Sequence, residues 1–154
     1  MKLSSPIRLL AQGLVLGGVL AVFSATLVQA ESVTVINDGV NIRTGPGIKY
    51  PIYMEVFKGY PLKVLKRDGE WLEVADVDND KGWIFTALTR KGDTVIVDAK
   101  QSANMRSGPG TDNPIIANVQ RGVVMEHLDT KGDWYKLKHT QGTTGWMHKS
   151  LLWP

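Results

Sequence analysis

A seven-residue segment occurs twice in this 154-residue chain, and the two copies begin 63 residues apart. Residues 41–47 read Asn-Ile-Arg-Thr-Gly-Pro-Gly, and residues 104–110 read Asn-Met-Arg-Ser-Gly-Pro-Gly. The same offset aligns further residues without a gap from the first expected strand to the end, among them Pro51 with Pro114, Gly59 with Gly122, Trp71 with Trp134, and Leu88 with Leu151. A period of about sixty residues predicts two copies of one small domain, and each copy must bury its own core.

Each copy has the pattern of a chain built from short strands. The β-branched run 33–35 and the apolar run 52–57 suit strands, while Asp68-Gly69 and Lys131-Gly132 are typical of tight hairpin turns. Glycine and proline in the repeated Gly-Pro-Gly segment indicate a loop with unusual backbone angles. No segment has a helical period of useful length. The sequence therefore predicts an all-β fold, with about five strands in each of two small barrels.

The order of these motifs resembles that of the bacterial SH3 domain family. Asn-x-Arg-x-Gly-Pro-Gly is followed by an apolar run with a glycine, then by Gly-(Asp/Glu)-Trp, and finally by Gly-Trp with a closing leucine. The resemblance covers residues 33–89 and 96–153, and it implies two tandem SH3-like β-barrels, in residues 31–91 and 92–154. It also implies a setting, because family members are commonly found in envelope proteins, often beside cell-wall hydrolases, and are thought to bind peptidoglycan or other wall components. Fold alone does not determine function.

The first thirty residues are typical of a secretory signal peptide. Lys2 and Arg8 come before or at the start of an apolar stretch over residues 9–28, and Val-Gln-Ala at 28–30 suits cleavage. The alternative is an uncleaved membrane anchor, because the stretch approaches the ~20 residues that a bilayer requires. We predict an exported protein, periplasmic or secreted, that meets a membrane only through residues 1–30 if they are not cleaved.

The charge of the chain argues against nucleic acid as a partner. The formal net charge of +3 falls to +1 when Lys2 and Arg8 are removed with the signal peptide, because 16 basic residues then face 15 acidic ones. Proteins that hold a phosphate backbone concentrate positive charge on one face. The sequence contains no comparable cluster of lysine and arginine.

We predict that the chain is not an enzyme and uses no cofactor or metal. It contains no cysteine, so it has no thiolate nucleophile, disulfide or zinc–thiolate site. His127, His139 and His148 do not have the spacing of a metal-binding motif, and no serine lies in a nucleophile motif. The two repeats occupy the whole chain after the predicted signal peptide, which leaves no room for a catalytic domain.

Three alternating aspartates resemble the start of a calcium-binding loop. Asp76, Asp78 and Asp80 alternate as calcium ligands do, but position six of the loop is Lys81 instead of glycine. Position twelve is Ala87 instead of a bidentate glutamate. We therefore interpret the segment as a solvated acidic loop that joins two strands.

The repeated arginines are the first candidates for a binding site. Arg43 and Arg106 can present a bidentate fork to a carboxylate, such as those of wall stem peptides. In the alternative interpretation, each arginine pairs within its barrel while Gly-Pro-Gly shapes the loop. Repetition in both copies agrees with either interpretation.

Aromatic residues are concentrated in the first copy. Tyr50, Tyr53, Phe57 and Tyr60 are replaced in the second copy by Asn, Ile, Gln and Val. An exposed cluster of such rings can stack on a sugar or hold an extended peptide, and the alternative is that the rings cover the interface between the barrels. The tryptophans are paired across the repeat, which indicates packing in or near the core. The candidate ligand-binding residues are Arg43, Tyr50, Tyr53, Trp83, Arg106 and Trp146.

Two functional hypotheses follow from these observations. The first is a non-catalytic exported module that binds peptidoglycan, a cell-wall peptide or another envelope component through a groove between loops. The second is an envelope adaptor without direct wall binding, which holds a protein partner through a sheet edge or the surface between the barrels.

Overall fold

The computed structural model describes residues 30–154 of the chain. Apart from Ala30, the predicted signal peptide lies outside the described residues. Within residues 30–154, no helix is long and apolar enough to cross a membrane. The strands and both buried cores of the described part lie between Ser32 and Trp153. A fragment of residues 31–154 therefore contains the complete described fold.

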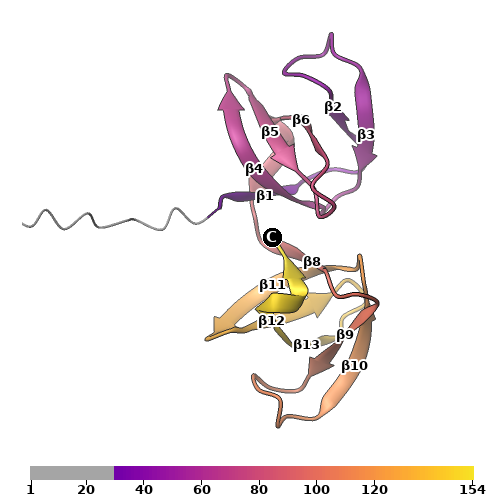
Figure 1. The fold of residues 1–154 in the computed structure, drawn as a ribbon, viewed down its shortest axis with the longest axis vertical. Helices are drawn as coiled ribbons and strands as arrows, with labels where there is room; N and C mark the ends of the chain where they lie inside the picture. The colour runs from indigo at the N-terminus through magenta and orange to yellow at the C-terminus, as the bar shows by residue number, and fades with distance from the viewer. Residues whose placement is uncertain (1–29) are drawn as a thin grey trace, which may run out of the picture.

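The described chain folds into two barrels, which lie one above the other in Figure 1. The first contains β1 (Ser32–Val35), β2 (Val40–Arg43), β3 (Ile52–Val56), β4 (Pro61–Asp68), β5 (Trp71–Ala75), β6 (Lys81–Phe85), the 3-10 turn η1 (Thr86–Leu88) and β7 (Thr89–Lys91). The second contains β8 (Thr94–Val97), β9 (Ser102–Arg106), β10 (Ile115–Gln120), β11 (Val124–Lys131), β12 (Trp134–His139), β13 (Thr144–His148), η2 (Lys149–Leu151) and β14 (Leu152–Trp153). The predicted all-β fold with two tandem small barrels is confirmed, with seven strands in each barrel instead of about five.

The two sheets have the same topology. The strand order is β3-β2-β6-β5-β4-β1-β7 in the first barrel and β10-β9-β13-β12-β11-β8-β14 in the second. All neighbouring strands pair antiparallel. Each sheet curls without closing, so β3 and β10 are edge strands.

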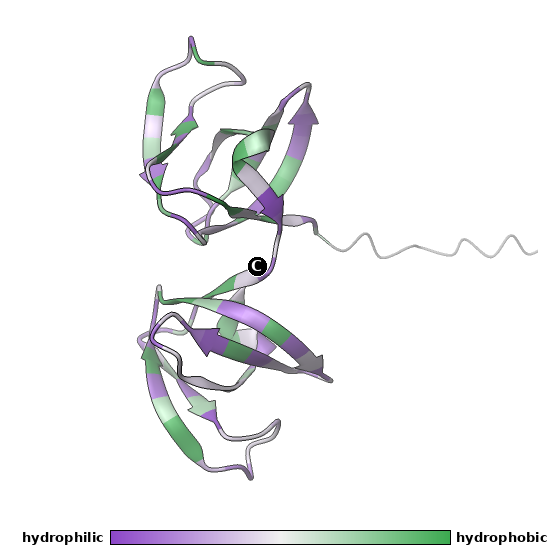
Figure 2. Cartoon of the chain, turned by 180° about the vertical axis from the view of Figure 1, so that it is seen from behind, coloured by the Kyte–Doolittle hydropathy of each residue, from purple (hydrophilic) through white to green (hydrophobic). Residues whose placement is uncertain are grey.

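Alternation along the strands separates the core from the outer face. In β2, Val40 and Ile42 are buried while Asn41 and Arg43 are half-buried on the opposite side. The side-chain period of two in a strand produces this separation, and Figure 2 shows the resulting bands of hydrophobic and hydrophilic residues. The repeated motif Asn-x-Arg therefore places its two polar side chains on the outside of the barrel.

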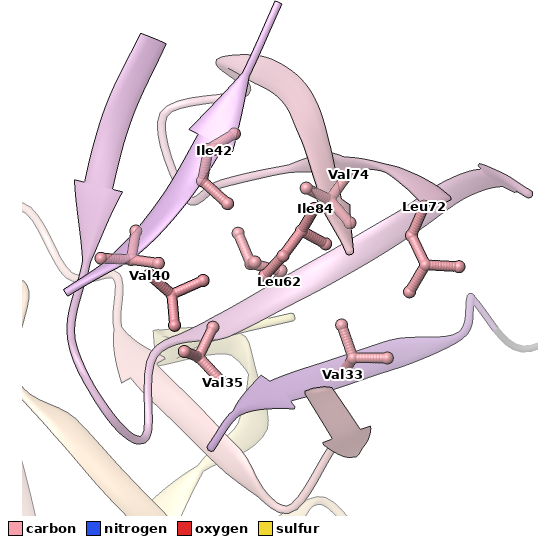
Figure 3. Close-up of a cluster of buried hydrophobic side chains, with 9 residues drawn as sticks. Val33, Val35, Val40, Ile42, Leu62, Leu72, Val74 and Ile84 are labelled. Carbon is pink, nitrogen blue, oxygen red and sulfur yellow. The ribbon is translucent and has the colours of Figure 1, made fainter. Parts of the chain in front are cut away.

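Each barrel is held by a small aliphatic core. The first core is formed by the buried side chains of Val33, Val35, Val40, Ile42, Val56, Leu62, Leu72, Val74 and Ile84 (Figure 3). The second core uses methionine at three equivalent positions, Met105, Met125 and Met147. Methionine fills irregular space with a flexible side chain, so the two cores have the same framework and different packing.

The first strands of the two barrels, β1 and β8, are equivalent at an offset of 62 residues, whereas the repeated motifs are related by an offset of 63. Val33 pairs with Leu62 in the first barrel, whereas Val95 pairs with Met125 in the second. The second copy therefore has one extra residue between its first two strands. The expectation that the repeats align without a gap is wrong at this loop, because β-branched residues on both sides of the true register hide a shift of one position.

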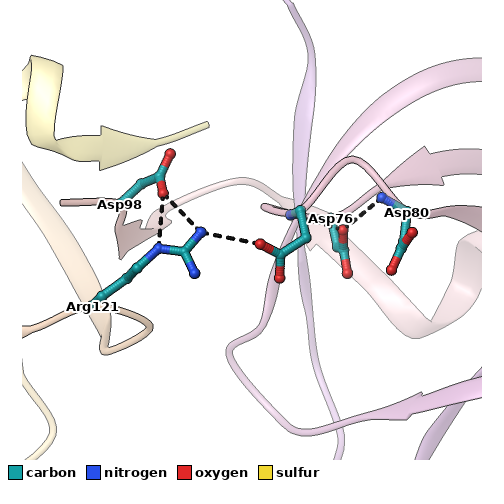
Figure 4. Close-up of polar contacts among 5 residues, drawn as sticks. Asp76, Asp80, Asp98 and Arg121 are labelled. Atoms are coloured by element: carbon teal, nitrogen blue, oxygen red, sulfur yellow. Dashed lines mark hydrogen bonds and ion pairs between the residues drawn. The ribbon is translucent and has the colours of Figure 1, made fainter. Parts of the chain in front are cut away.

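Two polar contacts join the barrels. Thr34 Oγ1 of β1 lies 2.8 Å from Thr94 Oγ1 of β8, and both residues are buried. Arg121 of the second barrel donates from Nη2 to Asp78 Oδ1 of the first barrel, at 3.0 Å, and to Asp98 Oδ1 of its own barrel, at 3.2 Å (Figure 4). The barrels are thus connected by side chains as well as by the chain between β7 and β8.

Candidate functional site

Each barrel has a groove at the same place on its surface. The first groove has a volume of about 620 Å³ and the second about 290 Å³. The equivalent residues that line both grooves are Gly39 and Ser102, Val40 and Ala103, Asn41 and Asn104, Arg43 and Arg106, Ile48 and Thr111, Trp71 and Trp134, Phe85 and His148, and Leu88 and Leu151. The duplicated groove is the candidate binding site, and its volume is larger in the first barrel.

The arginine of the repeated motif holds the Gly-Pro-Gly loop. Arg43 Nη1 donates to the carbonyl oxygens of Ile48 (3.2 Å) and Tyr50 (2.9 Å). Arg106 Nη1 donates to the equivalent carbonyl oxygens, those of Thr111 and Asn113, each at 2.8 Å. One nitrogen of each guanidinium is therefore committed to the loop. These contacts favour the structural interpretation of the motif, while both arginines also line their grooves.

The ring of Tyr50 packs against the same loop, at Gly45. A methyl group built on Gly45 would lie 2.5 Å from Tyr50 Cδ1, so the aromatic ring lies directly against the glycine. Asn113 takes the same position against Gly108 in the second barrel. The glycine is required here by the close approach of a side chain. Tyr50 itself is absent from the lining of the first groove.

Tyr53 lies on the edge strand β3, outside the residues that line the first groove. Arg43 pairs with Ile52 and Ile42 pairs with Met54, so Tyr53 is the extra residue of a β-bulge. Its side chain is 48% exposed. The negative charge of Asp80 is the largest of the influences that raise the pKa of the Tyr53 hydroxyl.

Trp83 and Trp146 lie on the outer faces of β6 and β13, half-buried and outside the two cores. Trp83 is paired across the sheet with Arg43, and Trp146 is paired with Arg106. The Nζ atom of Lys66 lies 6.0 Å from the ring centroid of Trp83. Both tryptophans are therefore next to the groove arginines without lining the grooves themselves.

The aromatic wall of each groove contains a tryptophan, Trp71 or Trp134, that the sequence interpretation placed in or near the core. In the first groove the rings of Trp71 and Phe85 lie 5.6 Å apart between centroids. In the second groove Trp134 and His148 are 5.5 Å apart. The signal in the sequence was the repeated Gly-(Asp/Glu)-Trp motif, but only strand pairing brings Phe85 beside Trp71.

Phe57 and Tyr60 are the other two of the four aromatic residues that the second copy lacks, and they lie near the junction of the barrels. Phe57 and Tyr60 form an edge-to-face pair, with centroids 5.3 Å apart, and Tyr60 packs against the first core. Phe57 lines a cavity of about 400 Å³ together with Thr94 and Val124 of the second barrel. Of these two rings, that of Phe57 lies near the neighbouring barrel and that of Tyr60 lies against the core of its own barrel.

The aspartate segment is only partly the solvated loop that we expected. Asp76 is 5% exposed, and its Oδ1 accepts backbone N–H groups of Asp78 (3.0 Å) and Asp80 (2.8 Å). Asp76 therefore organises the turn between β5 and β6, in which Asn79 has a φ of 65°. Among residues 30–154, no group of three His, Cys, Asp or Glu side chains is arranged to hold a metal ion.

The topology, the arginine that holds the loop and the grooves beside it define a small SH3-like domain. Models of the bacterial SH3 domain match residues 38–90 and residues 99–154. The chain belongs to the bacterial SH3 domain family and contains two of these domains in tandem.

Its relatives include proteins named for cell-wall chemistry. The chain is 33% identical over 84% of its length to the putative N-acetylmuramoyl-L-alanine amidase YrvJ of Bacillus subtilis, of which it spans 26%. It is 42% identical over 32% of its length to the probable cell wall amidase LytH of Staphylococcus aureus, of which it spans 17%. The likeness to these relatives supports a cell-wall-related module.

A solved structure from another organism has a weaker likeness. NlpC2 from Trichomonas vaginalis is 16% identical to the chain, with a TM-score of 0.35, and the match covers 82% of this chain and 48% of that one. At this score the likeness says nothing about the function of the chain.

The prediction that the chain is not an enzyme is contradicted by these relatives. A relative that matches 84% of the chain is named as a putative amidase, which points to an enzyme. The prediction rested on two repeats that occupy the chain and on the lack of a nucleophile motif. Both arguments concern only the given chain, which spans 26% of that relative, so neither bears on the remaining part of the relative.

Proposed function

We propose that the two barrels recognise peptidoglycan in the cell envelope, in the periplasm or outside the cell, and that this recognition serves a cell-wall amidase activity. The observation that carries the proposal is the groove that both barrels form from equivalent residues, in a chain whose relatives are named as cell-wall amidases. Two similar grooves suit a polymer that repeats the same chemical unit, because a second contact on the same chain gains from a high effective concentration.

The first groove has the composition of a site for a peptide. Trp71 and Phe85 offer apolar faces, and Ile48 at the tip of the arginine-held loop is 83% exposed. Asn41 adds an amide that can donate to and accept from a backbone. A few polar groups beside aromatic walls are the usual pattern of a small binding site. In this proposal Arg43 and Tyr50 shape the groove, with Arg106 in the same role in the second barrel.

The first test is co-sedimentation of residues 31–154 with protein-free peptidoglycan. We expect saturable retention that Trp71→Ala weakens by about tenfold, the loss typical of an aromatic residue central to an interface. Trp134→Ala is the matched change in the second barrel and is expected to have a smaller effect, since the volume of its groove is smaller. Absence of retention at moderate salt would overturn the proposal.

A second arm of the experiment tests the candidate residues outside the groove. Tyr53→Ala changes an exposed ring on the edge strand, and Trp83→Ala and Trp146→Ala change the rings beside the arginines. If the ligand stays in the groove, Tyr53→Ala leaves retention unchanged. Loss of retention in Tyr53→Ala with none in Trp71→Ala would move the site from the groove to the edge of the sheet.

One observation favours the alternative of a protein partner. The edge strands β3 and β10 each have two consecutive exposed apolar or aromatic residues, Ile52 with Tyr53 and Ile115 with Ile116. An edge strand has unpaired backbone groups that a partner strand can bond. Capture of an envelope protein that Ile115→Lys abolishes, combined with no retention on protein-free wall, would favour an adaptor.

A further inference from the structure

The two grooves differ in charge, although their frameworks are the same. The first groove is lined by Asp38, Glu70 and Arg43, whereas Arg106 is the only Asp, Glu, Lys or Arg that lines the second. Asp38 is fixed in place, since its Oδ1 accepts the backbone N–H of Lys58 at 2.9 Å. The first groove is thus acidic and the second basic, so one duplicated surface offers two electrostatic environments.

In the second barrel, the residue equivalent to Glu70 is Asp133, and it has a lysine ammonium group beside it. Lys149 Nζ lies 2.7 Å from Asp133 Oδ1, and Asp133 directly precedes Trp134 in the chain. The hydrogen bond from Lys149 lowers the pKa of the Asp133 carboxyl group. The second copy thus shows where an ammonium group binds a carboxylate that precedes the repeated tryptophan.

The first barrel has the same backbone arrangement without that ammonium. Glu70 is equivalent to Asp133, and Thr86 is equivalent to Lys149. The backbone N–H of Thr86 donates to the carbonyl oxygen of Glu70 at 2.8 Å, just as that of Lys149 donates to Asp133. The Glu70 side chain forms no ion pair with any residue of the described part. Glu70 is an exposed residue and lines the first groove.

We infer that the first groove binds a peptide that carries a primary ammonium group, which pairs with Glu70 beside the rings of Trp71 and Phe85. The inference rests on the proposed function, and it names the chemical feature of the wall that the first barrel recognises. An ammonium group is attracted to a carboxylate and to aromatic faces at the same time. A neutral amide at the same place lacks the positive charge on which both attractions depend.

The walls of the groove favour a peptide amine over an amino sugar. The groove is lined by the exposed Ile48 as well as by Glu70, and its aromatic side chains are suitable partners for aliphatic side-chain stems. A free amino group on a side chain can reach Glu70 while its stem lies on Trp71. The second groove does not make this selection, because Lys149 already occupies Asp133.

The test compares retention of residues 31–154 on protein-free peptidoglycan before and after acetylation of its free amino groups. We expect acetylation to weaken binding by about three- to tenfold, as for one exposed ion pair aided by aromatic contact. Glu70→Gln should bind the untreated wall as weakly as the wild type binds acetylated wall, and it should no longer respond to acetylation. Asp133→Asn is the matched control, and its response to acetylation should equal that of the wild type.

An exchange between the copies tests the position of the ammonium directly. Thr86→Lys supplies the first barrel with the lysine of the second, so it should lower retention on untreated wall and reduce the response to acetylation. The same pair is tolerated in the second barrel, and an unchanged melting temperature of Thr86→Lys would show that its fold is intact. Competition with N-acetyl-Ala-Lys, whose one free amine is on the side chain, with its Nε-acetyl form and with glucosamine identifies the source of the amine.

The outcomes separate this inference from the proposed function. If the protein is retained equally on untreated and on acetylated wall, the inference about the ammonium group is overturned and wall recognition still holds. Competition by glucosamine and not by N-acetyl-Ala-Lys would overturn the assignment to a peptide. No retention on either wall would overturn the proposed function, and the inference with it.

Discussion

Thr34 and Thr94 form a buried hydrogen bond across the junction of the two barrels, with their hydroxyl oxygens 2.8 Å apart. Thr34 Oγ1 also accepts the backbone N–H of Asp93 at 3.2 Å, so the last residue before β8 is tied to the first barrel. Because water does not reach these groups, their bonding depends on how the barrels meet.

Replacement of Thr34 by valine tests this junction. Thr34→Val keeps the shape of the side chain and leaves the Thr94 hydroxyl and the Asp93 N–H without their partner, which should lower the free energy of unfolding by about 1–3 kcal/mol. Thr94→Val removes one partner only and should cost less. Urea denaturation monitored by tryptophan fluorescence measures both, and equal stability of Thr34→Val and the wild type would contradict the prediction.

Replacement of Arg121 tests whether the orientation of the barrels depends on an ion pair. Arg121→Gln removes the donor that bridges Asp78 and Asp98, and these carboxylates raise the pKa of the arginine. Since all three side chains are largely exposed, we expect little change in melting temperature and greater relative motion of the barrels. NMR relaxation of the two barrels measures this motion, and 1 M salt should produce a similar effect in the wild type by screening. Unchanged relaxation in the variant would show that the threonine pair suffices.

Replacement of Gly45 tests the support of the loop. Gly45→Ala forces its methyl group against the ring of Tyr50, which should destabilise the first barrel by about 1–3 kcal/mol. In a Tyr50→Ala background the same substitution should cost much less, because the obstructing ring is gone. A double-mutant cycle of unfolding free energies measures the difference, and additive effects would contradict it.

Stability at alkaline pH should depend on Tyr60. Partial burial, followed by the charges of Asp76 and Asp78, raises the pKa of its hydroxyl above the ordinary value. The folded state thus holds the proton more tightly than the unfolded state, so stability should fall as pH rises from the ordinary tyrosine pKa of about 10 towards the raised one. Tyr60→Phe should show a smaller fall. Denaturation curves between about pH 9 and pH 11 test this, and parallel curves would contradict it.

The repeat, the all-β class and the family could be read from residues close together in the chain. Asn-x-Arg-x-Gly-Pro-Gly and Gly-(Asp/Glu)-Trp are local patterns, and glycine and proline restrict the backbone wherever they occur. The one-residue shift between the first strands could not be read. A run such as Thr94–Val97 satisfies either register by composition, and only its pairing with β11 identifies Val95 as the equivalent of Val33.

The candidate site shows the same division. Arg43 was visible as a candidate because it recurs, but its bonds to the carbonyls of Ile48 and Tyr50 depend on the path of a loop. The asymmetric aromatics suggested one cluster in the sequence. In the structure Tyr50 lies behind the loop, Tyr53 on an edge bulge and Tyr60 against the core.

The sequence by itself determined that two copies of one small β domain follow each other, because local turn chemistry and the alternation of side chains do not depend on distant contacts. Tertiary structure alone decided that Phe85 joins Trp71 in a groove, that Lys149 pairs with Asp133, and that Glu70 faces the groove without such a partner. These relationships join residues on different strands, and their side chains meet only after the sheet has curled and its register has been set.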